Sequence, residues 1–305
     1  MSKEIKYCIQ RNLKKDNIKL KTIYKGGDRS FTAGYFKSKL WDVDSVIKIQ
    51  FVEPSNNISW TPVSTLISVG NNHDIDPIEK DIRNMTPEAA IKKVVMEKIQ
   101  PHVSVKFEFV NIKGDVRIGF TASEGSYSFV GTDCKQEEYK KTLNFGWLDA
   151  RTIMHEFGHV LGMIHEHQNP LGEPIKWDES YIYDWAKKSQ GWDQETTYNN
   201  IIKPYNVDDI NGSYFDDKSI MLYFFPPEFT MDKKGTVQNN KLSDIDIEWM
   251  GKIYPTGILP KNNDKTEEEA SKSKIKSIIM YVLIVFLIVI VAILIFKKII
   301  DLIYK

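Results

Sequence analysis

The sequence predicts an α+β fold for the main part of the chain, followed by one apolar helix near the C-terminus. Residues 46–52 (VIKIQFV) and 103–110 (VSVKFEFV) alternate apolar and polar side chains, as half-buried strands do. Residues 86–99 lie between them and are typical of a helix, because Thr86 can act as the N-cap and Pro87 suits the first helical position. Several strands and then helices follow, an order that predicts an α+β domain.

The remaining elements of this domain are indicated by turn and capping residues. Further strands are expected at residues 116–120 (VRIGF), 127–130 (YSFV) and 142–147 (TLNFGW). Asp149 is a good N-cap for a helix that begins ARTIMHEFGHVLG, and Gly162 suits the left-handed conformation at its end. A closing helix is expected after Ser243, whose spacing to Asp246 resembles a capping box, and Pro255 prevents its continuation.

The composition excludes several classes of protein. The 305 residues include 41 Lys plus Arg and 41 Asp plus Glu, so the formal net charge is zero. That balance argues against a protein whose main task is to bind nucleic acid, and no nucleic-acid partner is expected. The chain holds only 2 cysteines, Cys8 and Cys134, which excludes a disulfide scaffold and fits a folded part in a reducing compartment.

The chemistry of the chain is indicated by its histidines. His155 and His159 are four residues apart on one predicted helix, so both imidazoles project from the same face and can bind one metal ion. Glu156 lies beside the first of them, where its carboxylate can reach a metal-bound water without binding the metal. His165 follows Gly162, where a sharp turn can bring the chain back to the ion, and the whole segment reads HEFGHVLGMIH.

This segment resembles the zinc motif of the metzincin metalloproteases, H-E-x-x-H-x-x-G-x-x-H. The Gly and the third His lower the frequency of chance matches by a factor of about nine hundred, from the 17 Gly and 6 His in the chain. Metzincins also have a methionine-containing turn beneath the zinc, and the segment Ser219-Ile220-Met221-Leu222-Tyr223 fits it. This S-x-M-x-Y pattern and Glu166 after the third histidine are most similar to the astacin group and its microbial or viral relatives.

The resemblance implies a metzincin-like zincin domain, in which a twisted mixed sheet packs on a zinc-binding helix with a Met-turn below it. It implies one catalytic Zn²⁺ held by His155, His159 and His165, with Glu156 as general base and proton shuttle. Tyr223 would be an additional zinc ligand or would stabilise the transition state. The implied reaction is the hydrolysis of peptide bonds in a protein or peptide substrate, which we expect to pair with residues 142–147 as an edge strand.

Some alternatives stay open at this level. The same fold could be a catalytically silent, membrane-tethered module that binds peptides, although the intact Glu156 favours the enzyme. Glu166 is expected to be a structural hydrogen-bonding residue, since the chain lacks the cysteines and the following residues of secreted astacins. His167 could lie behind the zinc ligands or in a substrate pocket, or could be a partly exposed histidine with no such role.

A second signal lies near the C-terminus, where residues 278–296 (IIMYVLIVFLIVIVAILIF) carry no charge. As a helix, this segment would be ~28 Å long, which matches the hydrocarbon core of a bilayer. Lysines flank it on both sides, as suits the headgroup regions. A buried core helix is the weaker interpretation, because such a helix rarely lacks a polar face. We therefore expect residues 278–296 to contact a lipid bilayer.

These signals predict an order of parts along the chain. They are an N-terminal arm (1–35), a metzincin-like catalytic domain (36–256), a polar linker (257–276), a transmembrane helix (277–298) and a short tail (299–305). The N-terminus shows no apolar segment of the kind found in signal peptides. We therefore expect a single-pass membrane protein, anchored near its C-terminus, with a cytosolic catalytic domain; in a virus, the membrane could be that of the host or the virion.

Overall fold

The computed structural model describes residues 34–69, 75–171, 175–211 and 214–257. Contacts within the chain divide it into two units, Met1–Gly257 and Ile258–Lys305, and all described residues belong to the first. Among the helices of these residues, none is long and apolar enough to cross a membrane. The predicted transmembrane segment 278–296, the tail and nearly all of the linker lie outside the described part of the chain, so the membrane anchor stays a prediction.

A mixed sheet of five strands forms one side of the core, in the spatial order β3-β2-β4-β6-β5. The strands are β2 (Val46–Phe51), β3 (Lys106–Phe109), β4 (Val116–Gly119), β5 (Tyr127–Ser128) and β6 (Leu143–Asn144). Four strands are parallel, and only β5 runs antiparallel, with Tyr127 opposite Asn144. The five predicted strands therefore all exist, although each is shorter than expected and the last two have only two residues each.

The edge strand differs from the prediction. Residues 142–147 were expected at the edge of the sheet, but β6 lies between β4 and β5. The reason is that the chain turns back after β4 and places β5 on the outside, where it pairs with β6 alone. The strand at this edge is thus β5, whose two residues are buried.

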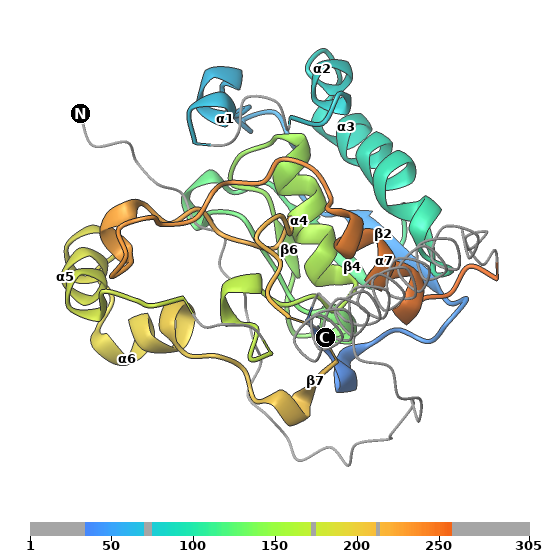
Figure 1. The fold of residues 1–305 in the computed structure, drawn as a ribbon. Coiled ribbons are helices and arrows are strands. Elements are labelled where there is room, and N and C mark those ends of the chain that lie inside the picture. The colour runs from blue at the N-terminus through green and yellow to red at the C-terminus, as the bar shows by residue number, and fades with distance from the viewer. Residues whose placement is uncertain (1–33, 70–74, 172–174, 212–213, 258–305) are drawn as a thin grey trace, which may run out of the picture. The chain divides into compact units, whose positions relative to one another are not determined.

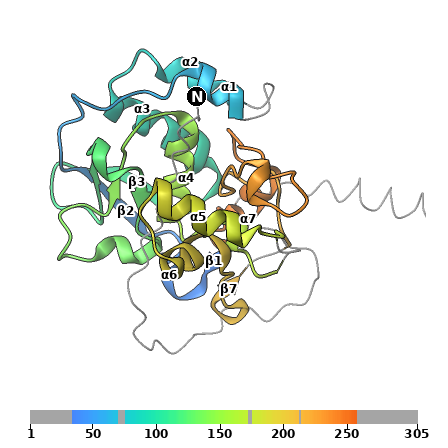
Figure 2. The same ribbon diagram turned by 90° about the vertical axis from the view of Figure 1, so that its left-hand side faces the viewer.

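The described residues form seven α-helices, which are labelled in Figure 1 and seen from another side in Figure 2. They are α1 (Val63–Val69), α2 (Ile78–Ile82), α3 (Pro87–Val94), α4 (Ala150–Val160), α5 (Glu179–Ser189), α6 (Gln194–Thr197) and α7 (Asp244–Ile253). The helix predicted at 86–99 is α3, capped by the Thr86 side chain, and it continues as a π-helix at Val95–Ile99. The predicted capping box of α7 is present as well. Helices α1, α2, α5 and α6 were not predicted.

The helix α4 lies in the centre of the main core. Its residues Ile153 and Phe157 are completely buried, as are Ile49 of β2 and Ile91 of α3. The ring of Phe157 meets that of Phe107 edge to face, with their centroids 5.8 Å apart. A second apolar cluster joins Ile182 of α5 to the segment after the Met-turn. The histidine-bearing helix is therefore held by the sheet and α3 on one side.

Both ends of α4 are closed by side chains, and all of these except the N-cap Asp149 come from distant parts of the chain. At the N-terminus, Asp149 accepts a hydrogen bond from the Thr152 N–H at 2.6 Å, and Glu79 accepts one from the Ala150 N–H at 2.6 Å. At the C-terminus, the Trp41 indole N–H donates to the Val160 carbonyl and the Tyr254 hydroxyl donates to the Leu161 carbonyl, both at 2.7 Å. Unpaired carbonyls at a helix end need such donors when they are buried.

The first described residues also contribute to this arrangement. The strand β1 (Tyr35–Phe36) pairs antiparallel with β7 (Ile210–Asn211), and neither strand was predicted. The Phe36 N–H of β1 donates to the Gly162 carbonyl, and the Gly34 carbonyl just before β1 accepts from the Ile164 N–H. Gly34 precedes the domain predicted from residue 36, and Phe36 is its first residue. Both hydrogen bonds hold the turn that follows α4.

The Tyr254 hydroxyl provides a test of how the end of α4 is held. In Tyr254→Phe, the Leu161 carbonyl and the backbone N–H of Trp41 both lose a buried partner. We expect the free energy of unfolding to fall by about 1–2 kcal/mol, the usual cost of such a loss. Urea unfolding followed by tryptophan fluorescence measures it.

The matched control is Tyr198→Phe, because Tyr198 is 40% exposed and water can reach its hydroxyl group. We expect less than about 0.5 kcal/mol for this variant, as for most surface substitutions. Equal stabilities of the two variants would show that the Tyr254 hydroxyl does not hold the helix end.

Candidate metal centre

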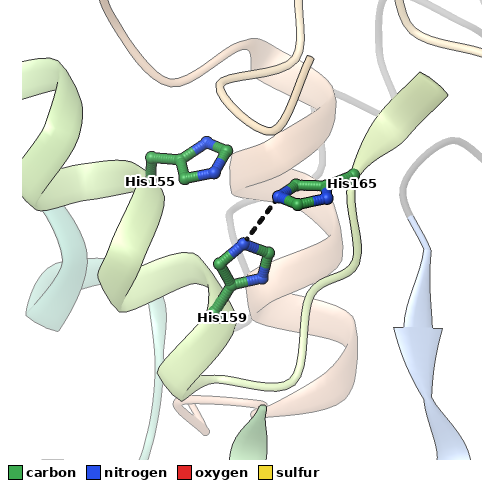
Figure 3. Close-up of side chains that lie close together, drawn as sticks. All are labelled: His155, His159 and His165. Atoms are coloured by element: carbon green, nitrogen blue, oxygen red, sulfur yellow. Dashed lines mark hydrogen bonds between the residues drawn. The ribbon is translucent and has the colours of Figure 1, made fainter. Parts of the chain in front are cut away.

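Three buried histidines meet at the end of α4. His155 and His159 come from adjacent turns of the helix, and His165 follows the turn at Gly162, as Figure 3 shows. Gly162 has a φ of 97°, a left-handed conformation that other residues rarely adopt. One ligand atom from each histidine lies within 4.8 Å of the other two, and the Nε2 atoms of His159 and His165 are 3.0 Å apart. The structure thus brings together all three histidines that the sequence singled out.

Backbone carbonyls determine which ring nitrogens face the centre of this cluster. The Nδ1 of His155 lies 2.9 Å from the Ile220 carbonyl oxygen, and the Nδ1 of His159 lies 2.8 Å from that of Met163. A carbonyl oxygen only accepts, so each Nδ1 carries the proton and donates it. Each Nε2 is then left with a lone pair, which is the form that binds a metal. The Nε2 of His155 is buried with no hydrogen-bond partner among the described residues.

Burial also keeps the cluster neutral. Desolvation lowers the pKa of His155 and His165 well below its ordinary value, and it lowers the pKa of His159 to about 4. Neutral imidazoles are the ligands that Zn²⁺ takes from histidine. The Nε2 atoms of His159 and His165 are 3.0 Å apart, close to the ~3.3 Å expected for two tetrahedral ligands at 2.0–2.1 Å from zinc. The residues present therefore fit a zinc ion.

The predicted Met-turn lies directly beneath this helix. A Cβ added to Gly158 would come within 2.5 Å of the Met221 sulfur, so the absence of a side chain at Gly158 lets Met221 pack against α4. The turn also supplies the Ile220 carbonyl that orients His155. Met221 is buried, as predicted for an apolar floor below the histidines.

The Met-turn is itself fastened to α7 by one buried carboxylate. Asp246 accepts hydrogen bonds from the Ile220 N–H at 2.8 Å, from the Ser219 hydroxyl at 2.8 Å and from the Ser243 N–H at 2.9 Å. Burial raises the pKa of Asp246 to about 6 despite these bonds. The capping box that the sequence indicated for α7 thus also holds the turn below the metal ligands.

Glu156 and Tyr223 lie at the same place. Glu156 is completely buried on α4, between the two helical histidines in the sequence. The Tyr223 ring is 4.2 Å from that of His165 and 5.7 Å from that of His155, measured between centroids. The structure therefore places a phenol beside two of the predicted ligands, and a buried carboxylate on the helix that carries two of them.

The two residues after His165 are buried too. Glu166 accepts from the Asp216 N–H at 2.8 Å and from the Asn169 amide at 3.0 Å, in keeping with the structural role expected of it. Burial raises the pKa of Glu166 to about 8. His167 is 7% exposed and packs against Tyr223, so it is not the partly exposed histidine of one interpretation. The sequence offered no signal for its aromatic neighbours Trp177 and Phe225.

The neutral state of the histidines has a measurable consequence in the metal-free chain. The pKa of His159 is about 4 when folded and ~6.5 when unfolded, so as the pH falls the unfolded chain takes up a proton first. His159 therefore stabilises the folded state above pH ~6.5, and this contribution is lost as the pH falls toward 4. Between pH 7 and pH 5, we expect wild type to lose about 2 kcal/mol of stability relative to His159→Gln.

Urea unfolding of both proteins at each pH, in the presence of a chelator, measures this difference. The comparison isolates His159, because Glu166 and Asp246 titrate in both proteins; their raised pKa values make them act in the opposite sense. A stability difference that does not change with pH would mean that folded His159 accepts a proton as readily as the unfolded chain does.

Comparisons with known proteins agree with this geometry. The profile of the Astacin family of peptidases matches residues 78–255, more than half of the chain. Astacin-like metalloprotease toxin 1 of Loxosceles intermedia is 26% identical over 190 residues, which cover 56% of this chain and 69% of the toxin. The structure of myroilysin superimposes with a TM-score of 0.57 at 28% identity and covers 73% of this chain and 98% of its own. The chain therefore belongs to the astacin family and is a zinc-dependent metallopeptidase, with the zinc-binding arrangement formed by His155, His159 and His165.

Proposed function

We propose that the chain is an endopeptidase in which Glu156 is the general base and proton shuttle. The observation that carries this proposal is the convergence of ligand atoms from three neutral histidines, two of which have their Nδ1 atoms on backbone carbonyls, with a buried carboxylate on the same helix. A bound zinc lowers the pKa of a coordinated water to about 7 and polarises a carbonyl. Glu156 accepts the proton of the attacking water and delivers it to the amine nitrogen that leaves.

Tyr223 completes the proposed catalytic machinery. Its ring packs directly on His165, and its side chain is 5% exposed. A phenol at this place can donate a hydrogen bond to the oxygen on which negative charge develops, or it can act as a further ligand to the metal. A positioned donor of this kind contributes most in a site from which water is excluded.

The substrate is proposed to bind as an extended strand. Within the described residues, the outer strand β5 is paired only with β6, and it contacts α4. The outermost strand of a sheet is where an added peptide can pair with backbone N–H and C=O groups. Such pairing uses the peptide backbone and suits substrates of varied sequence, so the edge at β5 replaces residues 142–147 as the proposed site of pairing.

The membrane anchor is the further part of the proposal. Residues 278–296 are uncharged and flanked by lysines, and the linker before them is polar. The enzyme would act beside a membrane, with its catalytic unit on the cytosolic side. Proteins or peptides close to that surface would then be its substrates.

The role of Glu156 is tested by Glu156→Gln, which keeps the size of the side chain and removes its basicity. We expect kcat for cleavage of an unfolded protein to fall about 10²–10⁴-fold, the usual contribution of general acid–base catalysis. The variant should still bind one zinc per chain, because Glu156 is not proposed as a ligand. Peptide release and zinc content are the measurements.

Glu195→Gln is the matched control, since Glu195 is exposed on α6 and should retain wild-type activity. A chelator should abolish cleavage by wild type, and added zinc should restore it. A Glu156→Gln variant as active as wild type would contradict the role of Glu156. A wild-type chain that binds one zinc and cleaves no substrate would support a silent peptide-binding module.

The anchor is tested by fractionation of cells that express the chain with an N-terminal fluorescent protein. We expect the fusion in the membrane pellet after alkaline carbonate extraction, and a deletion of residues 277–305 should release it. Protease added to the cytosolic side should remove the fluorescence without disruption of the membrane. Release of the full chain by carbonate would exclude the anchor, and protection from the protease would place the catalytic unit on the other side.

A further inference from the structure

His167 lies in a position that the zinc site does not explain. It belongs to the 3-10 helix Glu166–Gln168, which follows the third histidine, and its side chain is buried. Its ring stacks on that of Tyr223, with the centroids 4.9 Å apart and an interplanar angle of 26°. A parallel, offset contact of this kind is a favourable geometry for two aromatic rings.

Tyr223 therefore contacts two imidazoles. The centroid of its ring is 4.2 Å from that of His165 and 4.9 Å from that of His167. The ring of His167 also stacks on that of His165, with the centroids 5.3 Å apart. Any movement of the Tyr223 ring must change its contact with His167, so His167 influences where the phenol rests.

The position of His167 is itself determined by packing. The edges of its ring contact Phe225 and Trp177, with centroid distances of 5.0 Å and 6.2 Å. Its Nε2 is 3.5 Å from the Asn200 carbonyl oxygen, which is long for a hydrogen bond. Asn200 belongs to the π-helix Tyr198–Ile202, and the neighbouring Gln168 amide donates shorter hydrogen bonds to the Asn199 and Lys203 carbonyls, at 3.0 Å and 2.9 Å. A flat ring at position 167 is thus held more by aromatic contacts than by a hydrogen bond.

We infer that His167 is a positioning residue for Tyr223: its ring keeps the phenol beside His165, in the place where it can serve the reaction. This inference rests on the proposed function of Tyr223. This role of His167 differs from a purely structural one, because the effect of His167 on the reaction must pass through Tyr223. The loss caused by substitution of His167 should therefore disappear when the Tyr223 hydroxyl is absent.

The first experiment is a double-mutant cycle in the full-length, zinc-loaded chain. His167→Ala removes the stacked ring, and we expect kcat to fall about three- to tenfold with little change in KM, as suits one aromatic contact. His167→Phe keeps a flat ring and should stay within about twofold of wild type. In the Tyr223→Phe background, His167→Ala should cause no further loss.

The second experiment reports the position of the ring without any catalysis. The full-length chain is labelled with 3-fluorotyrosine, and the ¹⁹F resonance of Tyr223 is assigned as the one missing from Tyr223→Phe. We expect His167→Ala to shift this resonance and His167→Phe to shift it less. Tyr181→Ala is the matched control, because the Tyr181 ring contacts Phe229, and it should leave the Tyr223 resonance in place.

The outcomes separate this inference from the proposed function. An unmoved Tyr223 resonance in folded His167→Ala would overturn the positioning role, as would an equal loss of kcat in both backgrounds. If Tyr223→Phe has the kcat of wild type, the proposed function of Tyr223 fails, and the ¹⁹F shift alone decides whether His167 holds the ring. If His167→Ala does not fold, the test rests on a folded His167→Phe variant. A Tyr223 resonance that moves in this variant to its position in the denatured protein would overturn the inference.

Discussion

The hydrogen bonds from the Nδ1 atoms of His155 and His159 to two backbone carbonyls are the interactions on which the rest of the site depends. They determine the tautomer of each imidazole and so turn the Nε2 lone pairs toward one point. The two carbonyls belong to Ile220 in the Met-turn and Met163 in the turn after α4. The helix can therefore present its ligands correctly only when both turns are in place.

The surrounding fold keeps those two turns in place. Gly162 allows the sharp turn after α4, and Phe36 and Tyr254 hold the carbonyls at that end of the helix. On the other side, Asp246 fastens the Met-turn to α7. Burial of this carboxylate is unfavourable in itself, and three hydrogen bonds offset the cost. Segments from near both ends of the domain thus converge on one helix, although they are distant in sequence.

Much of this could be predicted from the sequence, because the relevant signals are local. The spacing of His155, His159 and His165 follows from one helix and one glycine turn, and the caps at Thr86, Asp149 and Ser243 act within three residues. The order of the strands in the sheet is not local. Residues 127–130 and 142–147 both have the composition of strands, and only the path of the chain after β4 places β5 outside β6. Likewise, the stack of His167 on Tyr223 joins residues whose neighbourhood no periodicity indicates.

The central claim is that one zinc ion is bound by the Nε2 atoms of three histidines, two of which have their Nδ1 atoms engaged by the backbone. Anomalous diffraction at the zinc absorption edge, from crystals of the zinc-loaded chain, tests this most directly. We predict one strong peak per chain at ~2.0–2.1 Å from the Nε2 atoms of His155, His159 and His165. Zinc bound through an Nδ1 atom would contradict the claim. So would zinc bound by a carboxylate in place of one of these histidines.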